Sequence, residues 1–312
     1  MTIIHYSIII PHHNIPHFLD RCLQSIPIRE DVQIIVVDDC SDTLFLKKVK
    51  ALEEKYPTAM FIYSSENGGG GKARNIGMSY AVGQYIIFAD ADDFFSDNFS
   101  DVLDAYQTAT EDIIYFRNYS VLSDNRTIFL EESKWIDRIF DNFILTPDFN
   151  EIICNIYTPW AKFFRRSFIL EHNIVFDETP IANDVIFVVS AGCLAKTRIV
   201  VQEAIYFYTK RHDSITDSFS NKPEGLRIRT EVCFRAQKIM IKYGYHIRCM
   251  PLSTFMHRAY LHDRPLYYEY LRRSSEVYRS IWEVLFQIRC LENGYTAKIL
   301  LYLRSFFGLF FR

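Results

Sequence analysis

The stretch Tyr85–Asp93 (YIIFADADD) joins a short apolar run to a dense group of carboxylates. Apolar runs of this length, bounded by polar residues, are typical of buried β-strands. Carboxylates crowded at a strand end repel one another, and a divalent cation bound by oxygen ligands removes that repulsion. This pattern alone leaves two interpretations open: a Mg²⁺ or Mn²⁺ site among the carboxylates of Asp90–Asp93, or a solvated acidic turn.

Similar apolar strands alternate with helical spacing along the rest of the N-terminal part. Gln33–Val37 (QIIVV), for example, ends at Asp38–Asp39. Such alternation predicts βαβ units and a mostly parallel sheet, with ligands bound beyond the carboxyl ends of its strands. The expected strands are Ser7–Pro11, Gln33–Val37, Met60–Tyr63, Tyr85–Ala89, Asp112–Tyr115 and Ile199–Val201, and the expected helices are Phe18–Ile26, Leu46–Lys55, Lys72–Ala81 and Asp184–Leu194.

Four consecutive glycines, Gly68–Gly71, stand before Lys72–Ala73–Arg74. The segment is not a P-loop, because Ala73 stands where Ser or Thr should follow the lysine. We predict a mobile loop that a ligand can approach closely, followed by a helix whose start favours an anion near Lys72 and Arg74. A plain flexible loop is the alternative.

Composition and charge narrow the class of protein. Hydrophobic residues make up 49% and charged residues 23% of the 312 residues, which excludes disordered and low-complexity classes. Residues 1–221 carry a net charge of −12 and residues 222–312 one of +9, which excludes a uniformly basic nucleic-acid binder. The seven cysteines are scattered without a CxxC pair, which predicts neither a disulfide framework nor a zinc knuckle and is typical of a reducing cytoplasm.

Together these segments resemble glycosyltransferase family 2, the inverting nucleotide-sugar glycosyltransferases of the GT-A fold. The resemblance covers about residues 5–217 and implies an α/β GT-A fold with a mostly parallel central sheet. Seven segments are similar to the family's own and stand in its order: Ser7–Asn14 (SIIIPHHN), Ile34–Asp42 (IIVVDDCSD), Gly71–Gly77 (GKARNIG), Tyr85–Asp93 (YIIFADADD), Trp160–Arg166 (WAKFFRR), Asn183–Phe187 (NDVIF) and Tyr208–Thr216 (YTKRHDSIT).

The resemblance also implies a role for each matching residue. Asp184 would be the general base, although a helix N-cap is its simpler role. Asp92, with Asp90, would hold the Mn²⁺ or Mg²⁺ that bridges the diphosphate. The residues implied to bind the nucleotide-sugar are Pro11, His13, Asn14, Asp38, Asp39, Arg74, Asp90, Arg211 and His212.

The chemistry of an inverting transfer agrees with these residue types. One carboxylate can deprotonate an acceptor hydroxyl as it attacks the anomeric carbon in a single displacement, and the departing nucleoside diphosphate calls for a cation. The resemblance implies a metal-dependent hexosyl- or N-acetylhexosaminyltransferase that moves sugar from a UDP-sugar to a hydroxyl of a glycan or lipid-linked acceptor in surface polysaccharide biosynthesis. A nucleotidyltransferase and a non-catalytic nucleotide-sugar binding protein are the alternatives.

Three residues depart from the family pattern. His13 stands in place of the usual Tyr, and its charge depends on pH. Cys40 replaces a glycine after Asp39, which puts the turn there in question. Asn183 replaces the Glu before the base and supplies no negative charge.

We expect a catalytic domain over residues 1–221, with a nucleotide-binding half (1–100) and an acceptor half (101–221), and a basic helical region over residues 222–312. Three hypotheses remain for the basic region: contact with a membrane surface, a helical subdomain, or an oligomer interface. Membrane contact would use the tail Lys298–Arg312 (KILLYLRSFFGLFFR), whose aromatic and basic residues suit an anionic lipid surface. The expected location is cytoplasmic, peripheral at the inner face of the cell membrane if the tail binds lipid, and no nucleic-acid partner is expected.

Overall fold

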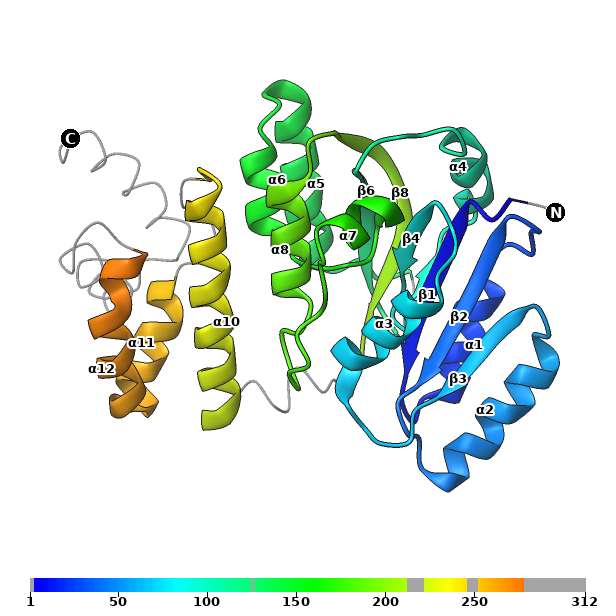
Figure 1. Cartoon of the computed structure of the whole chain (residues 1–312), viewed down its shortest axis with the longest axis horizontal. Helices are drawn as coiled ribbons and strands as arrows, with labels where there is room; N and C mark the ends of the chain where they lie inside the picture. The colour runs from blue at the N-terminus through cyan, green and yellow to red at the C-terminus, as the bar shows by residue number, and fades with distance from the viewer. Residues whose placement is uncertain (1–2, 124, 126, 212–221, 246–251, 278–312) are drawn as a thin grey trace. The chain divides into compact units, whose positions relative to one another are not determined.

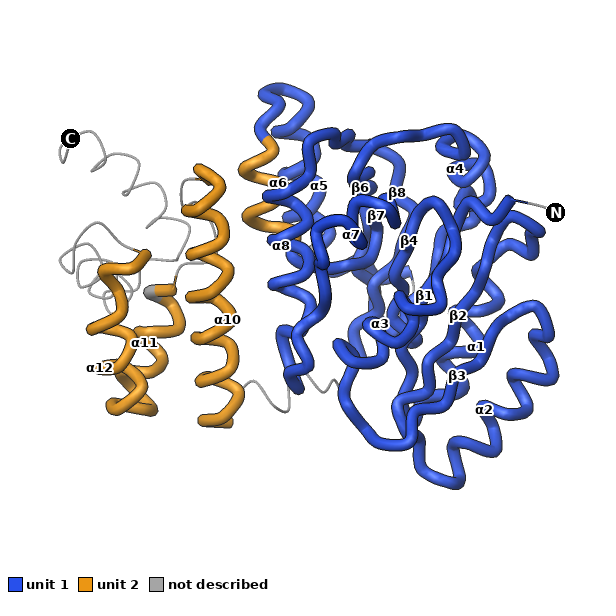
Figure 2. Tube along the Cα trace, in the orientation of Figure 1, with its two compact units in different colours: residues 1–148, 157–212 blue, residues 149–156, 213–312 orange. Residues whose placement is uncertain are grey.

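The computed structural model describes residues 3–123, 125, 127–211, 222–245 and 252–277 (Figure 1). The chain forms two compact units, Met1–Asp148 with Tyr157–His212 and Phe149–Ile156 with Asp213–Arg312 (Figure 2). The sequence prediction placed a boundary after residue 221 and kept Phe149–Ile156 with the N-terminal part. That segment belongs to the second unit, where Cys154 Sγ lies 3.9 Å from Met240 Sδ.

The first unit is built on an eight-stranded sheet with the order β3-β2-β1-β4-β7-β6-β8-β5. Its parallel part confirms the four expected N-terminal strands, with ends shifted by one residue at most. Each strand is a short apolar run, and in β1 and β4 nearly every residue is buried. The bounds are β1 (Tyr6–His12), β2 (Val32–Asp38), β3 (Ala59–Tyr63) and β4 (Tyr85–Phe88).

The other part of the sheet mixes directions. β7 (Lys162–Arg165) lies between β4 and β6 (Ile113–Leu122) and is antiparallel to both. β8 (Arg198–Lys210) runs parallel to β6 and antiparallel to the short β5 (Phe94–Phe95). β6 and β8 are longer than the predicted Asp112–Tyr115 and Ile199–Val201, because the strand pairing continues through residues without a clear apolar pattern.

Helices connect these strands, and α3 packs on β1 and β2 (Figure 1). The prediction that α3 starts at Lys72 after a glycine loop is wrong, because the helix begins at Gly69. A Cβ atom at Gly71 would lie 1.9 Å from the carbonyl oxygen of Asp177, so this glycine serves close packing rather than mobility. The helices of the first unit are α1 (Pro16–Gln24), α2 (Thr43–Lys55), α3 (Gly69–Tyr80), α4 (Phe99–Ala105), α5 (Glu131–Leu145), α7 (Arg166–Glu171) and α8 (Val185–Leu194).

An aromatic cluster fixes the start of α8 against the sheet. The Phe187 ring of α8 stacks on Phe176 at 4.0 Å between centroids and meets Phe88 of β4 edge-on at 5.4 Å. Phe164 of β7 completes the cluster at 5.2 Å from Phe187. Burying a side chain of this size contributes about 1.5–3 kcal/mol. The cluster therefore holds the segment just before Phe187 near the carboxyl end of β4.

The second unit is helical, as expected from its sequence. It contains α6 (Phe149–Asn155), α10 (Pro223–Lys242), α11 (Leu252–His262), α12 (Arg264–Arg273) and a 3₁₀ turn, η1 (Ser274–Glu276). Its apolar core includes Phe234, Met256 and Tyr270. Several of its cations are paired within the unit, such as Lys238 with Glu276 at 2.6 Å.

Two features of the chain bear on the sequence predictions. Cys154 of α6 is disulfide-bonded, which the scattered cysteines did not predict, whereas Cys22, Cys40, Cys193 and Cys233 are free thiols. Within the described ranges, no helix has the length and apolar character needed to cross a bilayer. The tail Lys298–Arg312 lies outside the described residues.

Candidate active site

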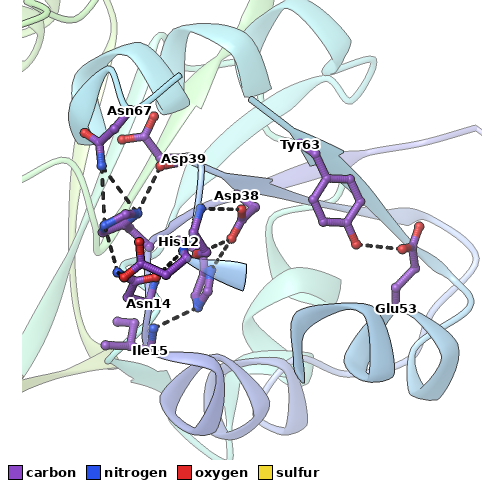
Figure 3. A network of polar contacts seen from close by, with 11 residues as sticks. His12, Asn14, Ile15, Asp38, Asp39, Glu53, Tyr63 and Asn67 are labelled. Carbon is purple, nitrogen blue, oxygen red and sulfur yellow. Dashed lines mark hydrogen bonds and ion pairs between the residues drawn. The ribbon is translucent and has the colours of Figure 1, made fainter. Parts of the chain in front are cut away.

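The parallel register of β1 and β2 places His12 opposite Asp38 at the carboxyl ends of both strands. His12 Nδ1 donates to Asp38 Oδ1 at 2.8 Å, and His12 Nε2 accepts the backbone N–H of Ile15 at 3.1 Å (Figure 3). Because a backbone N–H can only donate, these bonds define a neutral imidazole with its proton on Nδ1.

Asp38 receives two further bonds and lies below the surface. The backbone N–H of Ser41 donates to Oδ2 at 2.9 Å, and the Ser41 hydroxyl donates to Oδ1 at 2.6 Å. Burial raises the pKa of Asp38, but the bonds from His12 and Ser41 outweigh it and hold that pKa below its usual value. With only 1% of Asp38 exposed, its carboxylate supports this edge of the sheet from within.

Asp39 is also buried and is bonded to the start of α3. Its Oδ1 and Oδ2 accept the backbone N–H groups of Gly68 and Gly69 at 2.8 and 2.7 Å. A carboxylate here satisfies two of the free N–H groups at a helix N-terminus. Asp39 therefore fixes the glycine segment that the sequence predicted to be mobile.

The more accessible part of this edge is formed by His13 and Asn14, which are half-buried. His13 Nδ1 donates to the carbonyl oxygen of Asp39 at 3.0 Å, and Asn14 Nδ2 donates to His13 Nε2 at 3.1 Å (Figure 3). Asn14 also bonds Asp42 through both side-chain atoms, at 2.8 and 2.9 Å. These hydrogen bonds hold the His13 ring in one orientation, and Pro11, two residues earlier, is also half-buried.

The turn after Asp39 has a left-handed residue at Cys40, with φ +57°. Glycine adopts this conformation without penalty, whereas another residue costs about 1–2 kcal/mol. Cys40, which stands where the family has glycine, therefore keeps the backbone conformation that glycine would adopt, at the cost of strain.

The segment after β4 holds three carboxylates with different surroundings. Asp90 Oδ1 accepts from Arg74 Nη2 at 2.5 Å, and Asp92 Oδ2 forms an ion pair with Arg211 Nε at 2.7 Å. Asp93 is fully buried and accepts from the Tyr206 hydroxyl at 2.8 Å and the Thr209 N–H at 2.7 Å. We call Asp90–Asp93 the acidic loop.

The acidic loop accumulates negative charge. Burial, followed by the charge of Asp90, raises the pKa of Asp92 despite the opposing Arg211. Burial and the charges of Asp92 and Asp90 raise the pKa of Asp93 well above its usual value. Mutual repulsion of this kind is what a bound cation relieves.

Asp90 and Asp92 are the residues of the acidic loop that fit a divalent cation. Their side chains are 29% and 22% exposed, so both can reach an ion at the surface. In the part of the chain that the structure describes, no group of three or more His, Cys, Asp or Glu side chains could hold a metal ion. Mg²⁺ and Mn²⁺ sites that use one or two carboxylates and complete their shell with phosphates need no such group, so the donor set fits an ion of this type.

Asp184 stands at the N-cap position of α8 and is half-buried. Its side chain forms no capping hydrogen bond to the helix. The simpler role that the sequence left open, a side-chain N-cap, is therefore not what its carboxylate does. The aromatic cluster around Phe187 fixes the backbone from which this carboxylate extends.

Arg74 connects the acidic loop to the residue before Asp184. Its Nη2 bonds Asp90, and its Nη1 donates to Asn183 Oδ1 at 3.0 Å. This arrangement depends on Gly71, one turn earlier in α3, where an added Cβ would lie 3.0 Å from Asn183 Cβ. The structure thus joins Arg74, Asp90 and Asn183 directly, and α3 connects them to Asp39 at its own start.

Several residues of the site escaped the sequence analysis. Tyr206 donates to Asp93 and accepts the Asp90 N–H at 2.8 Å, and Arg21 donates to the carbonyl oxygen of Asp92. Nothing in the sequence singled out either residue, because Tyr206 lies in the apolar pattern of a strand and Arg21 in the ordinary pattern of a helix. A lysine inside the apolar run WAKFF, Lys162, was a visible signal of a buried cation. His212 lies outside the described residues.

Comparison with known proteins adds to this geometry. The family model described as glycosyl transferase family 2 matches residues 7–172. EpsJ of Bacillus subtilis (strain 168), named an uncharacterized glycosyltransferase, is 28% identical over 223 residues, or 68% of this chain and 62% of EpsJ. TarS of Staphylococcus aureus, named a poly(ribitol-phosphate) beta-N-acetylglucosaminyltransferase, is 24% identical over 228 residues, or 70% of this chain and 38% of TarS. The chain therefore spans less than two thirds of either relative.

Two solved structures share the fold. TarS in complex with UDP-GlcNAc superposes with a TM-score of 0.65 at 20% identity, covering 96% of this chain and 89% of that chain. The mannosyltransferase PcManGT of Pyrobaculum calidifontis, in complex with GDP-Man and Mn²⁺, gives a TM-score of 0.57 at 12% identity, covering 99% and 88%. These likenesses confirm the expected α/β GT-A fold.

Proposed function

We propose a sugar-transfer function from the premise that this chain belongs to glycosyl transferase family 2. In this proposal the chain transfers a hexosyl or N-acetylhexosaminyl group from a UDP-sugar to a hydroxyl of a glycan or lipid-linked acceptor, with inversion. The observation that carries it is the arrangement of Asp184. Its carboxylate forms no helix cap, and the residue before it bonds the arginine that holds Asp90.

Asp184 acts as the general base in this proposal. A half-buried carboxylate beside the acceptor accepts the hydroxyl proton while the oxygen attacks the anomeric carbon, so one carboxylate is enough for a single displacement. Hydrolases that act on glycosidic bonds would instead use a pair of carboxylates on either side of the scissile bond. Asn183 and Arg74 orient the segment that presents Asp184.

The nucleotide lies at the carboxyl ends of β1 and β2 in this proposal, against Pro11, His13 and Asn14. Asp39 fixes the start of α3 there, and Asp38 supports the edge from below through His12 and Ser41. Arg74 and Arg211 form ion pairs with the acidic loop. In this proposal their positive charges also offset the negative charge of the donor's diphosphate. His212, which follows Arg211 in the sequence, is also proposed to bind the nucleotide-sugar.

Asp90 and Asp92 would hold a Mg²⁺ or Mn²⁺ ion. When bound, this ion would supply positive charge to the departing diphosphate. The raised pKa of Asp92 supports the assignment, because it reflects crowded negative charge that a cation offsets. The Mn²⁺ in the PcManGT structure supports it by likeness of fold.

The names of two relatives support a proposal for the biological setting. TarS is named for transfer of N-acetylglucosamine to poly(ribitol-phosphate), and GgaB of Bacillus subtilis is named a minor teichoic acid biosynthesis protein. We place the chain in the assembly of a surface polysaccharide, acting in the cytoplasm. Contact with the inner face of the membrane through residues 298–312 stays a hypothesis.

A donor screen tests this proposal. The wild-type chain is mixed with a panel of UDP-, GDP- and TDP-sugars and Mn²⁺ or Mg²⁺, and thermal stabilisation and release of nucleoside diphosphate are measured. We expect at least one UDP-sugar to raise the melting temperature and to be slowly hydrolysed in a metal-dependent way. Release of inorganic diphosphate from a nucleoside triphosphate would instead indicate a nucleotidyltransferase. Stabilisation without any release, even with acceptor extracts, would indicate a non-catalytic binding protein.

A further inference from the structure

The acidic loop is a tight turn at the point where the chain leaves the sheet. The N–H of Asp93 donates to the carbonyl oxygen of Asp90 at 3.0 Å, which closes a β-turn. Just before this turn, the N–H of Ala89 still donates to the carbonyl oxygen of Ile9 in β1 at 3.1 Å. The N–H of Asp90 lies beyond the paired residues of β4, and a backbone N–H group that leaves a sheet needs another acceptor.

The hydroxyl of Tyr206 in β8 is that acceptor. It accepts the N–H of Asp90 at 2.8 Å and donates to Asp93 Oδ2, also at 2.8 Å. Because a backbone N–H can only donate, the single proton of the hydroxyl is directed to the carboxylate. One side chain from a distant strand therefore bonds both ends of the turn.

The position of this hydroxyl is fixed by the packing of its ring. Tyr206 is fully buried. The Trp160 ring lies nearly parallel to it at 5.3 Å between centroids, and the Phe95 ring of β5 meets it edge-on at 5.4 Å. A ring that is packed on two sides in a dense interior keeps one orientation. The hydroxyl is thus held at the turn by the core.

Thr209, also in β8, adds a second set of bonds to the turn. Its backbone N–H donates to Asp93 Oδ1 at 2.7 Å, and its hydroxyl donates to the carbonyl oxygen of Asp92. Arg21 of α1 donates to the same carbonyl oxygen. Asp90, Asp92 and Asp93 are therefore each bonded to β8, through the backbone or through the buried carboxylate.

These bonds decide which carboxylates of the acidic loop face outward. Asp93 is fully buried, whereas the side chains of Asp90 and Asp92 are 29% and 22% exposed. Fixing Asp93 inside the protein turns its neighbour Asp92 toward the surface, where an ion can also reach Asp90. Groups that hold metal ligands in place matter to the ion itself, and their removal typically lowers metal affinity by about 10- to 100-fold.

We propose that Tyr206 is a positioning residue for the cation site. It holds Asp90 and Asp92 in the arrangement that binds Mg²⁺ or Mn²⁺, with Asp93 as its buried anchor rather than a third ligand. This inference rests on the proposed function, because it takes Asp90 and Asp92 as the cation ligands. Tyr206 is fully buried and acts on the ion through the turn alone. The competing explanation is purely structural: the hydroxyl only satisfies buried polar groups.

Three matched substitutions separate these explanations. Tyr6 in β1 and Tyr85 in β4 are also buried, and their hydroxyls donate to the carbonyl oxygens of Leu103 at 2.6 Å and Glu111 at 2.8 Å. Tyr206→Phe, Tyr6→Phe and Tyr85→Phe each remove one such hydroxyl, so all three should lower the melting temperature to a similar extent. We expect only Tyr206→Phe to weaken Mn²⁺ binding, by about 10- to 100-fold, measured by EPR of free Mn²⁺ in titrations of the full chain.

Thr209 provides an independent pair of variants. Thr209→Val removes the hydroxyl that bonds the carbonyl of Asp92, whereas Thr209→Ser keeps a hydroxyl there. We expect Thr209→Val to weaken Mn²⁺ binding less than Tyr206→Phe does, because Arg21 still bonds that carbonyl. Thr209→Ser should bind Mn²⁺ as the wild type does. Equal weakening in Val and Ser variants would show that the hydroxyl is not what positions the turn.

A wild-type Mn²⁺ affinity in Tyr206→Phe, or an equal loss in Tyr6→Phe and Tyr85→Phe, would overturn the proposal in favour of the structural explanation. A second measurement needs no metal. Hydrogen exchange of the Asp90 amide, followed by NMR, should be slow in the wild type and faster in Tyr206→Phe, and unchanged exchange would refute the bond itself. If the Asp90 amide behaves as expected but the wild type binds no Mn²⁺, it is the cation site of the proposed function that fails.

Discussion

Aspartates stand at or just after the carboxyl ends of two buried strands of the same sheet, and their surroundings are opposite. Asp38, the last residue of β2, receives hydrogen bonds from His12 and Ser41, which hold its pKa below the usual value. Asp92 after β4 has a raised pKa, because burial and the neighbouring Asp90 outweigh Arg211. The same sequence pattern, an apolar strand followed by carboxylates, thus gives a fully hydrogen-bonded carboxylate at Asp38 and mutually repelling carboxylates at Asp90 and Asp92.

This difference separates stability from function. A carboxylate with a lowered pKa contributes to folding, whereas one with a raised pKa opposes folding and persists where a ligand uses it. The proposed function therefore gives Asp38 a structural role and Asp92 the role of holding the cation that would meet the diphosphate. The following variants test that division, beginning with the largest expected effect.

Asp92→Asn should lose about 100- to 1,000-fold in sugar transfer, the usual effect of removing a group that stabilises charge in the transition state. Its melting temperature without metal should equal or exceed that of the wild type, because one repelling carboxylate is gone. Transfer rates and thermal unfolding in EDTA measure both effects. If Asp92→Asn loses both thermal stability and activity, Asp92 supports the fold, as Asp38 does, and the division is contradicted.

His12→Ala should destabilise the fold by about 1–3 kcal/mol, because it removes one of the hydrogen bonds to the buried Asp38 carboxylate, which keeps only those from Ser41, and leaves the Ile15 N–H without its acceptor. Urea unfolding monitored by circular dichroism measures this. The matched control is His17→Ala on the exposed surface of α1, for which we expect a change within about 0.5 kcal/mol. Equal effects of the two substitutions would contradict the support role of His12.

The two aspartates should also respond to pH with opposite signs. Asp38 binds its proton less readily when folded, so its contribution is present above its unfolded pKa and lost as pH falls through the folded value. Asp92 binds its proton more readily when folded, so its penalty grows as pH rises above its unfolded pKa of about 3.9. The stability gained by Asp92→Asn over the wild type should therefore increase above about pH 4 and vanish below it. Melting curves in EDTA from pH 3 to 7 test this, and a pH-independent difference would refute the assigned shift.

Much of the fold could be predicted from the sequence, because β1 to β4 are short apolar runs whose period and length leave little choice. The contacts within the candidate site were harder to predict from the sequence. The start of α3 was missed because the reason for Gly71 is the carbonyl of Asp177, about a hundred residues away in the chain. The burial of Asp38 depends on the register with His12, and the position of Lys162 depends on β7 entering the sheet antiparallel between β4 and β6. Such contacts between distant segments leave no local pattern.

The central claim, that Asp184 is the base of a sugar transfer, is tested most directly by Asp184→Asn at saturating UDP-sugar and metal, with Asp97→Asn as an exposed control. We predict that Asp184→Asn binds the donor with an unchanged Kd and transfers about 100- to 10,000-fold more slowly, while Asp97→Asn behaves as the wild type. Wild-type transfer by Asp184→Asn, or a loss of donor binding that accounts for the whole loss of rate, would contradict the account.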